Sequence, residues 1–433
     1  MPQSLVVRDA RKVKAIKDEL TFSELFDKER KIVQTANGYE IPLVDQKADG
    51  SDHIDKQRVL TTAHGYKIPL VHQEGDVSGL FQDTFVTESS VAIPKPTPTS
   101  LQSALQLWNI DSDQFPSRWS VYPPMVLFPS GSHRQLEAID PPKDLYEYLL
   151  SRGLFGRKDL THIAVNAPLD ENDIVRRPHI IPVFGDFGQF LSDLPTNQDF
   201  STAFWVSSIQ NGIYQTWCPL YTMFSRGNIT EKARVLNEFS GQAPIKDQVI
   251  VDMYAGIGYF TFSYATQQPR RIFCWEINPW SVEALIRGAK KNGFPVKLVK
   301  ENEAYLEEDS DVIVVFFENN QNALKRLRSL QIMDRLTHVN LGLLPDSKQA
   351  FESATNMALR SQQTILHIHE NVKVDYLDCW QKDTKKSLQT IMSLPDPDWS
   401  HGTKHSIESI HLEKIKTFAP DIYHICGDFR VTS

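Results

Sequence analysis

The chain has 433 residues, of which 41% are hydrophobic and 23% charged, and its formal net charge is −8. This length is more than one compact core usually serves, so two or three domains are expected. The negative charge excludes an overall basic field, and any contact with nucleic acid must therefore depend on local basic patches. The four cysteines are scattered without a C-x-x-C pair, which argues against a disulfide framework and a zinc knuckle.

The first 103 residues are expected to form an N-terminal extension. The core Gly-Tyr-x-Ile-Pro-Leu-Val occurs in residues 35–46 and again in residues 62–73, which indicates a local duplication that is too short for a solenoid. Residues 91–103 are rich in Pro, Ser and Thr and are interpreted as a linker.

The sequence predicts neither a secreted nor a membrane protein. Its N-terminus is too charged for a signal peptide. No apolar run approaches the length of a membrane span. We therefore expect a soluble, cytoplasmic protein.

Residues 104–240 are predicted to form a smaller α+β domain. Apolar and polar residues alternate over 206–225, which predicts strand hairpins around Asn211-Gly212. Residues 227–235 open a helix.

From about residue 241 the pattern changes to strand, turn and helix. Strands are predicted at 248–254, 270–276, 296–300, 338–344 and 364–370, and helices at 259–266, 279–292 and 346–360. Residues 303–335 interrupt this pattern with an acidic run, a strand and a basic helix, and are interpreted as an insertion. Two alternating runs over 410–431 predict a final antiparallel pair. The domain 241–433 is therefore expected to be α/β and Rossmann-like, with a mostly parallel sheet.

The most informative pattern is VIVDMYAGIGYF, residues 249–260. Its apolar run ends at Asp252, and Gly256 and Gly258 permit a tight turn that brings the backbone close to a ligand. The next strand ends at Glu276, where a carboxylate can hold the hydroxyls of a ribose. The pattern predicts an adenosine-containing cofactor at the carboxyl end of the sheet; the alternative is a glycine turn without a nucleotide.

The turn also indicates which cofactor binds. Thr261 occupies the place of the third glycine of a dinucleotide motif, and Tyr259 and Phe260 crowd the helix start. Both features suit a ligand without phosphates. The D-x-x-x-G-x-G turn and the acidic second strand resemble the class I S-adenosylmethionine (SAM) transferase pattern, and that resemblance implies a seven-stranded sheet.

Three further strand ends carry polar side chains. The third strand ends at Glu301-Asn302, where a side chain would accept a hydrogen bond from an adenine amine, unless Glu301 is only a solvated loop acid. Asn340 ends the fourth strand and is expected beside the reacting carbon. His367 and His369 share one face of the fifth strand, and we expect a packed or hydrogen-bonded pair, with no metal.

Five motifs in order are similar to one known family: DMYAGIGYF, CWEINPWSVEAL, HVNLGLLP, LHIHENV and MFSRGNITEKARV. They resemble the eukaryotic wybutosine-synthesising aminocarboxypropyltransferases, whose family also holds the tRNA guanine-37 N1-methyltransferases. The similarity covers about residues 104–433 and is weaker over 4–34. It implies transfer of the 3-amino-3-carboxypropyl group of SAM to the tricyclic base 4-demethylwyosine at position 37 of tRNA-Phe, with release of methylthioadenosine. No metal and no obligatory protein partner are expected.

The resemblance further implies a set of SAM-contacting residues, which joins the glycine turn to positions on other elements. The set is Ser225, Lys232, Asp252, Tyr254, Gly256, Gly258, Glu276, Glu301 and Asn302. The family more often has Asp-Asn where this chain has Glu301-Asn302. The segment 303–335 and the duplication also depart from shorter members.

Two alternatives remain open. One is methylation of guanine 37, but Asn340-Leu341 is followed by Gly342 and the proline is delayed to Pro345, which favours aminocarboxypropyl transfer. The other is a non-catalytic RNA-binding subunit, which the intact glycine turn disfavours.

Two basic clusters are candidate tRNA contacts, although each could equally be a solvated helix face. One contains Lys325, Arg326 and Arg328, and the other runs from Arg8 to Lys17.

Overall fold

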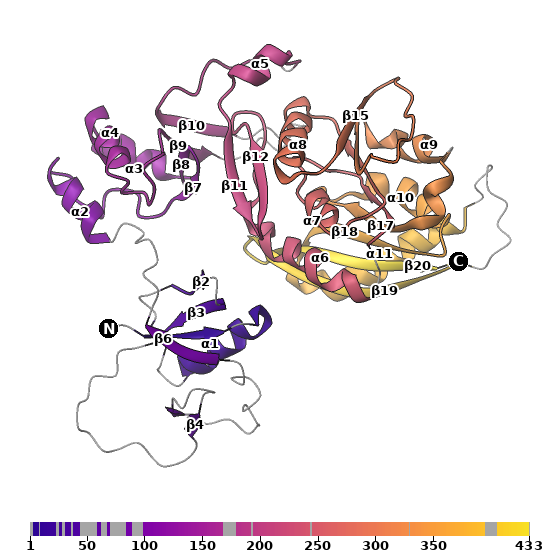
Figure 1. Cartoon of the computed structure of the whole chain (residues 1–433), viewed down its shortest axis with the longest axis horizontal. Helices are drawn as coiled ribbons and strands as arrows, with labels where there is room; N and C mark the ends of the chain where they lie inside the picture. The colour runs from indigo at the N-terminus through magenta and orange to yellow at the C-terminus, as the bar shows by residue number, and fades with distance from the viewer. Residues whose placement is uncertain are drawn as a thin grey trace. The chain divides into compact units, whose positions relative to one another are not determined.

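The computed structural model divides into two compact units, one of residues 1–101 with 154–156 and one of residues 102–153 with 157–433 (Figure 1). The predicted boundary at residue 240 lies inside the second unit and stays a prediction. The structure describes residues 3–7, 9–22, 26–27, 31–35, 38–43, 59–61, 67–69, 84–88, 98–167, 179–191, 194–242, 245–328, 330–394 and 405–432.

The first unit contains a four-stranded sheet in the order β2-β3-β1-β6. Its strands are β1 (Gln3–Val7), β2 (Val33–Thr35), β3 (Gly38–Pro42) and β6 (Thr84–Glu88). The short helix η1 (Ala10–Lys12) leads into α1 (Val13–Phe22), which packs Ile16 and Leu20 against Leu5 and Ile41. These apolar contacts form a small core of their own.

Each copy of the duplicated motif contributes the second strand of a hairpin. In the first copy β2 pairs with β3, and in the second β4 (Val59–Thr61) pairs with β5 (Lys67–Pro69). The remainder of the second copy lies outside the described residues, as do residues 91–97 of the predicted linker. The end of that linker is instead helical, because α2 spans Pro98–Gln106.

The second unit begins with a mixed sheet and a hairpin. The sheet has the order β10-β9-β8-β7, and the helices α3 and α4 join β8 to β9. The hairpin of β11 and β12 turns at Asn211 and Gly212, with φ angles of 52° and 77°. Positive φ at both positions is what a tight two-residue hairpin turn requires, so this prediction is confirmed. The bounds are β7 (Ser120–Tyr122), β8 (Met125–Phe128), α3 (Ser132–Ile139), α4 (Lys143–Ser151), β9 (His162–Ala167), β10 (His179–Phe184), α5 (Asn197–Thr202), β11 (Val206–Gln210) and β12 (Ile213–Trp217).

An eight-stranded sheet dominates the rest of the unit, in the order β15-β16-β14-β13-β17-β18-β20-β19. The six strands from β15 to β18 are parallel, and β20 pairs antiparallel with β18 and β19. This confirms the Rossmann-like class and the final antiparallel pair. The bounds are β13 (Val249–Asp252), β14 (Arg271–Glu276), β15 (Val296–Lys300), β16 (Ile313–Phe317), β17 (Leu336–Leu341), β18 (Gln363–Lys373), β19 (Ser406–Ala419) and β20 (Ile422–Thr432).

The expected strand number was wrong by one. The segment 303–335, interpreted as an insertion, contributes β16, which is hydrogen-bonded to both β14 and β15. Its residues Ile313–Phe316 are fully buried, as expected of an interior parallel strand covered on both faces. The segment is therefore part of the sheet, and it moves β15 to the edge.

Helices cover both faces of this sheet and bury two apolar layers. Val235 of α6, Phe262 of α7 and Leu285 of α8 pack on one face. Leu327 of α9, Phe351 of α10 and Leu377 of α11 pack on the other. Burying each such side chain contributes about 1.5–3 kcal/mol to the free energy of folding. The bounds are η3 (Arg226–Asn228), α6 (Ile229–Gln242), α7 (Thr261–Ala265), α8 (Pro279–Asn292), η4 (Asn320–Asn322), α9 (Ala323–Arg328), η5 (Gln331–Arg335), η6 (Lys348–Ala350), α10 (Phe351–Ala358), η7 (Val374–Tyr376) and α11 (Leu377–Met392). Among the described residues, no helix combines the length and apolar character needed to cross a membrane.

Candidate cofactor site

The glycine turn after β13 has the backbone that the sequence predicts. Gly256 and Gly258 have φ angles of 55° and 86°, in the left-handed region that favours glycine. A Cβ atom at Gly258 would lie 2.6 Å from the ring of Phe262, and one at Gly256 would lie 2.8 Å from the ring of Tyr259. Side chains at these positions would therefore force both rings to move.

Glu276, at the end of β14, lies against this turn. Its Oε2 accepts a hydrogen bond from the Gly256 N–H at 2.9 Å, and its Oε1 accepts from the N–H groups of Ile277 and Asn278 at 2.9 and 2.8 Å. Burial raises the pKa of Glu276, and the three N–H donors act in the opposite direction. The carboxylate is thus fixed in one orientation beside the turn, and Oε2, which accepts one bond, retains a lone pair for a ligand hydroxyl.

Asp252 and Asn340 form a buried hydrogen-bonded group next to the glycine turn. Asp252 accepts hydrogen bonds from Thr261 Oγ1 at 2.8 Å and from Asn340 Nδ2 at 3.0 Å, and only 1% of each of Asp252 and Asn340 is exposed. Burial raises the pKa of Asp252. Asn340 was expected beside the reacting carbon; the structure buries it with its amide bound to Asp252. Its structural role is to join β17 to β13.

Tyr254 lies next to the turn, half-buried, and burial raises the pKa of its hydroxyl. The neighbouring Met253 carbonyl accepts a hydrogen bond from Asn320 Nδ2 at 2.8 Å. This bond ties the end of β16 to the glycine turn.

In the folded chain Glu301 and Asn302 lie away from Glu276. Both are exposed at the end of β15. Because β16 lies between β15 and β14, these residues stand two strands from Glu276, a separation of about 10 Å. The adenine contact predicted for Glu301-Asn302 stays a prediction, but the position beside the Glu276 carboxylate is not theirs.

The structure places Glu318 and Asn319 in that position instead. Phe317 of β16 is in register with Glu276, and Glu318 and Asn319 follow directly. Glu318 is buried, and its two oxygens accept hydrogen bonds from Arg326 at 2.9 and 2.5 Å. Asn319 is exposed. Both VKLVK and VIVVFF are followed by Glu-Asn. The second run is more apolar, as interior parallel strands are, and this difference could have predicted which of the two lies inside the sheet.

Lys232 of α6 is buried beside the glycine turn. Its Nζ donates to Gln210 Oε1 at 2.9 Å and to Gln215 Oε1 at 2.5 Å. It also lies 5.1 Å from the ring centroid of Phe224 and 5.4 Å from that of Tyr259. Burial, and then the charge of Lys416, lower the pKa of Lys232 to about 7.

Ser225, which precedes η3, is hydrogen-bonded to a second lysine, Lys416 of β19. Its Oγ donates to Asn228 Oδ1 at 2.9 Å and accepts from Lys416 Nζ at 2.8 Å. Burial lowers the pKa of Lys416. Sequence reasoning missed Lys416 and the two glutamines because they are distant in sequence and carry no motif.

His367 and His369 are both hydrogen-bonded, but each to a different histidine and not to the other. His367 bonds to His338 at 2.9 Å through Nε2 and to Asp428 at 2.7 Å through Nδ1, and His369 bonds to His424 at 3.1 Å. Burial lowers the pKa of His424 to about 3 and that of His369 well below its usual value.

These histidines adjoin an ion cluster that fastens α6 to β20. Arg234 Nη2 donates to Glu231 at 2.6 Å, and Arg234 Nη1 donates to Asp428 at 2.7 Å. Two groups here have the spacing of metal ligands, Glu231 with His369 and Cys426, and His367 with Cys426 and Asp428. The guanidinium of Arg234 already supplies the positive charge among them, so the cluster is suited to stabilising the fold.

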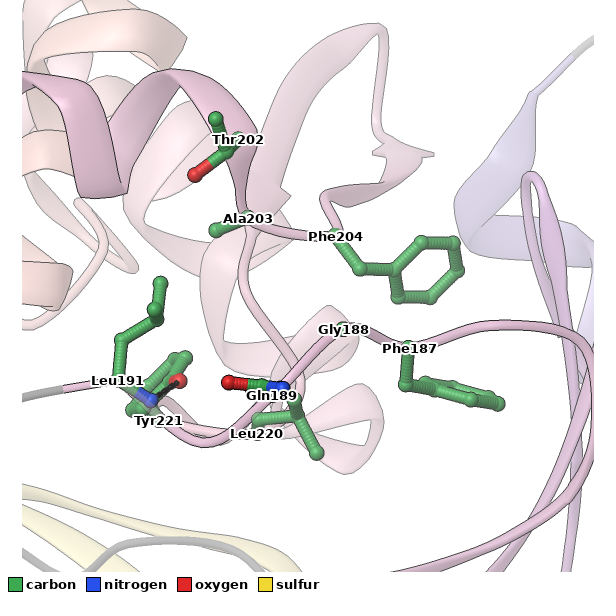
Figure 2. Close-up of a pocket in the computed structure, with 9 residues that line it drawn as sticks. All are labelled: Phe187, Gly188, Gln189, Leu191, Thr202, Ala203, Phe204, Leu220 and Tyr221. Atoms are coloured by element: carbon green, nitrogen blue, oxygen red, sulfur yellow. Dashed lines mark hydrogen bonds between the residues drawn. The ribbon is translucent and has the colours of Figure 1, made fainter.

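A separate hollow of about 140 Å³ lies between residues 187–191, the end of α5 and residues 220–221 (Figure 2). Tyr221 closes one side; its ring stacks on Trp280 at 3.9 Å, and its hydroxyl accepts from the Leu191 N–H at 2.7 Å. The remaining lining residues carry no titratable group. The hollow therefore offers packing, whereas groups suited to holding a polar ligand lie at the ends of β13, β14 and β16 and on α6.

Comparison with known proteins gives consistent matches. Residues 210–373 match the model of the TRM5/TYW2 methyltransferase domain. The tRNA wybutosine-synthesizing protein 2 of Schizosaccharomyces pombe is 40% identical over 333 residues, which cover 74% of each chain. The protein of the same name from Saccharomyces cerevisiae is 37% identical over 362 residues, covering 74% of this chain and 75% of that protein.

Among solved structures, TYW2 of P. horikoshii in complex with MeSAdo is similar in fold. The TM-score is 0.52 at 17% identity, with 78% of this chain and 99% of that chain covered.

Proposed function

The chain belongs to the tRNA wybutosine-synthesizing protein 2 family, and from this premise we propose that it is a SAM-dependent tRNA aminocarboxypropyltransferase. It transfers the 3-amino-3-carboxypropyl group of SAM to 4-demethylwyosine at position 37 of tRNA-Phe and releases methylthioadenosine. The observation that carries the proposal is the glycine turn with Glu276 fixed against it, in a chain 40% identical to a wybutosine-synthesising protein.

In this proposal the adenosine part of SAM lies along the ends of β13, β14 and β16. Glu276 accepts hydrogen bonds from the ribose hydroxyls. Backbone N–H groups hold its carboxylate in a fixed orientation for this contact. The backbone of Gly256 and Gly258 allows close approach of the ligand. Asn319, exposed at the end of β16, takes the adenine contact first assigned to Glu301 and Asn302.

The amino-acid part of SAM then extends toward Ser225 and Lys232. The sulfonium activates all three attached carbons, so orientation decides which one reacts, since a reacting carbon must lie about 3–3.5 Å from its nucleophile. With the γ-carbon facing the acceptor, a ring carbon of the base attacks it. The bond from sulfur to the γ-carbon breaks, its electron pair stays on sulfur, and the ring carbon then loses its proton.

Guanine-37 N1-methylation is the second candidate, because the matched domain is common to both activities. The identity of 37–40% to wybutosine-synthesizing proteins favours the first. A non-catalytic RNA-binding subunit is the third, and an absence of SAM binding would support it.

We also propose where the protein acts and on what. The substrate is tRNA-Phe, approached at its anticodon loop, without an obligatory protein partner. The location is the cytoplasm, which is supported by four cysteines that are all free thiols, as suits a reducing compartment.

The identity of the by-product tests the proposed reaction. The protein is incubated with SAM and tRNA carrying 4-demethylwyosine, and the nucleosides are separated by chromatography. Methylthioadenosine is expected. S-adenosylhomocysteine as the main by-product would establish the methyltransferase alternative.

A further inference from the structure

Two lysine side chains converge on the segment Phe224–Ser225, with Lys232 over the Phe224 ring and Lys416 bound to Ser225 Oγ. Lys232 is 2% exposed and comes from α6, whereas Lys416 comes from β19 and is half-buried. The hydrogen-bond partners of Lys232 are the two glutamine oxygens, and that of Lys416 is Ser225 Oγ. Across the described residues, neither amine has a carboxylate within ion-pair distance.

Such an arrangement is unfavourable without a further charge. Burying an ammonium is costly unless it is paired, and the two amines also repel each other, which the lowered pKa of Lys232 reflects. The glutamine oxygens satisfy hydrogen bonds but do not neutralise charge. The site as it stands is therefore complementary to an anion.

The position of the site indicates which anion. Lys232 lies over the ring of Tyr259, and Gln215 Nε2 donates to the carbonyl of Gly258 at 3.4 Å, so the Lys232 amine is next to the turn itself. Lys416 is bound to Ser225, the neighbour of Phe224, whose ring Lys232 also faces. Gly227 makes room for the second amine, because a Cβ atom there would lie 2.5 Å from Lys416 Cδ. A small carboxylate carried by a ligand on the turn can reach this enclosed position more readily than the backbone of a folded RNA.

We propose that Lys416 is a positioning residue that binds, together with Lys232, the carboxylate of the aminocarboxypropyl group of SAM. The inference rests on the proposed function and extends it. By holding the carboxylate at β19, Lys416 fixes the methionine chain so that its γ-carbon faces the acceptor base. Orientation, and hence the choice of the transferred group, then depends on this lysine.

Methylthioadenosine provides a direct test, because it keeps the adenosine and the methylthio group of SAM but lacks the carboxylate. Lys416→Met should weaken SAM binding about tenfold to a hundredfold, the effect of a lost charge-assisted hydrogen bond, and leave methylthioadenosine binding unchanged. Lys416→Arg should restore most of the SAM affinity. Gly227→Ala, which displaces the Lys416 side chain, should show the same selectivity more weakly. Calorimetry on the full chain measures the affinity of the wild type and of each variant for both ligands.

Lys414→Met is the matched control. Lys414 lies two positions earlier on β19 and is exposed, with its amine 5.8 Å from the ring centroid of Tyr423. It should bind both ligands like the wild type.

Three outcomes would overturn the inference. Unchanged SAM affinity in Lys416→Met removes the carboxylate contact. Equal weakening of SAM and methylthioadenosine makes Lys416 a structural residue only. Weaker tRNA binding with unchanged SAM affinity assigns the amine to an RNA phosphate. If the wild type binds neither SAM nor methylthioadenosine, it is the proposed function that fails.

Discussion

Removing the Arg234 guanidinium should strongly destabilise the second unit. Arg234 is 5% exposed and pairs with Glu231 and Asp428, whose side chains are 1% and 2% exposed. Arg234→Met keeps a similar apolar stem but leaves two buried carboxylates without their cation. Breaking one buried ion pair typically destabilises a protein by about 3–5 kcal/mol. Because one guanidinium serves both carboxylates, we expect a loss near the upper end, about 5 kcal/mol.

A loss of this size is comparable with the entire stability of many domains, about 5–15 kcal/mol. It should appear as a lower midpoint of urea unfolding, followed by tryptophan fluorescence. Because the chain has two units, the midpoint of the transition that includes Trp275 and Trp380 is the relevant quantity. SAM binding should fall with it, because α6 also carries Lys232.

Two further variants separate this explanation from simple loss of packing. Arg270→Met removes an ion pair with Asp309 whose side chains are 40% and 93% exposed, and should change stability by at most about 1 kcal/mol. Adding Glu231→Gln and Asp428→Asn to Arg234→Met should recover part of the loss, because the unpaired charges disappear. If Arg234→Met is within about 1 kcal/mol of the wild type, or the triple variant is no more stable than Arg234→Met, the buried ion pairs do not stabilise this unit as expected.

Three other predictions concern the cofactor, pH and RNA. Glu276→Gln should weaken SAM binding by about 1.5–3 kcal/mol, the range for a charged hydrogen bond, and unchanged affinity in calorimetry would exclude Glu276 as the ribose ligand. The pKa of His424 (about 3) and that of His369 are lowered in the folded chain. Below about pH 6.5 the unfolded chain therefore binds protons that the folded chain does not. As the pH decreases, the free energy of unfolding should fall by up to about 1.4 kcal/mol per pH unit for each histidine. Urea unfolding between about pH 7.5 and 5.5 measures this loss, and a flat profile would contradict the buried neutral histidines. Lys325→Glu with Arg328→Glu should weaken tRNA binding and flatten its dependence on salt, and an unchanged slope would identify a solvated helix face.

The sequence predicts local features well because their causes are local. The glycine turn, the Asn211-Gly212 hairpin and the strand–helix alternation each follow from neighbouring residues, and the structure contains all three. Arg326 illustrates the limit, because its position in a basic run suggested an RNA contact. Its guanidinium instead binds the buried Glu318, which is why it is left out of the charge reversal.

Strand order and long-range contacts could not be obtained in the same way. No pattern in residues 313–317 predicts that this strand lies between β14 and β15. That strand order decides whether Glu301 or Asn319 lies beside Glu276. Lys416 is 191 residues from Ser225, so their hydrogen bond is invisible to any local pattern. Asn340 was placed at the correct strand end, but its burial against Asp252 depends on the packing of α7.

Double labelling of SAM shows directly whether this chain transfers the aminocarboxypropyl group or the methyl group. Two preparations of SAM, one radiolabelled in the methyl carbon and one in the carboxyl carbon, are each incubated with the protein and tRNA carrying 4-demethylwyosine. The carboxyl label should enter the tRNA while the methyl label remains in methylthioadenosine. Methyl label in the tRNA, with the carboxyl label left in S-adenosylhomocysteine, would contradict this expectation.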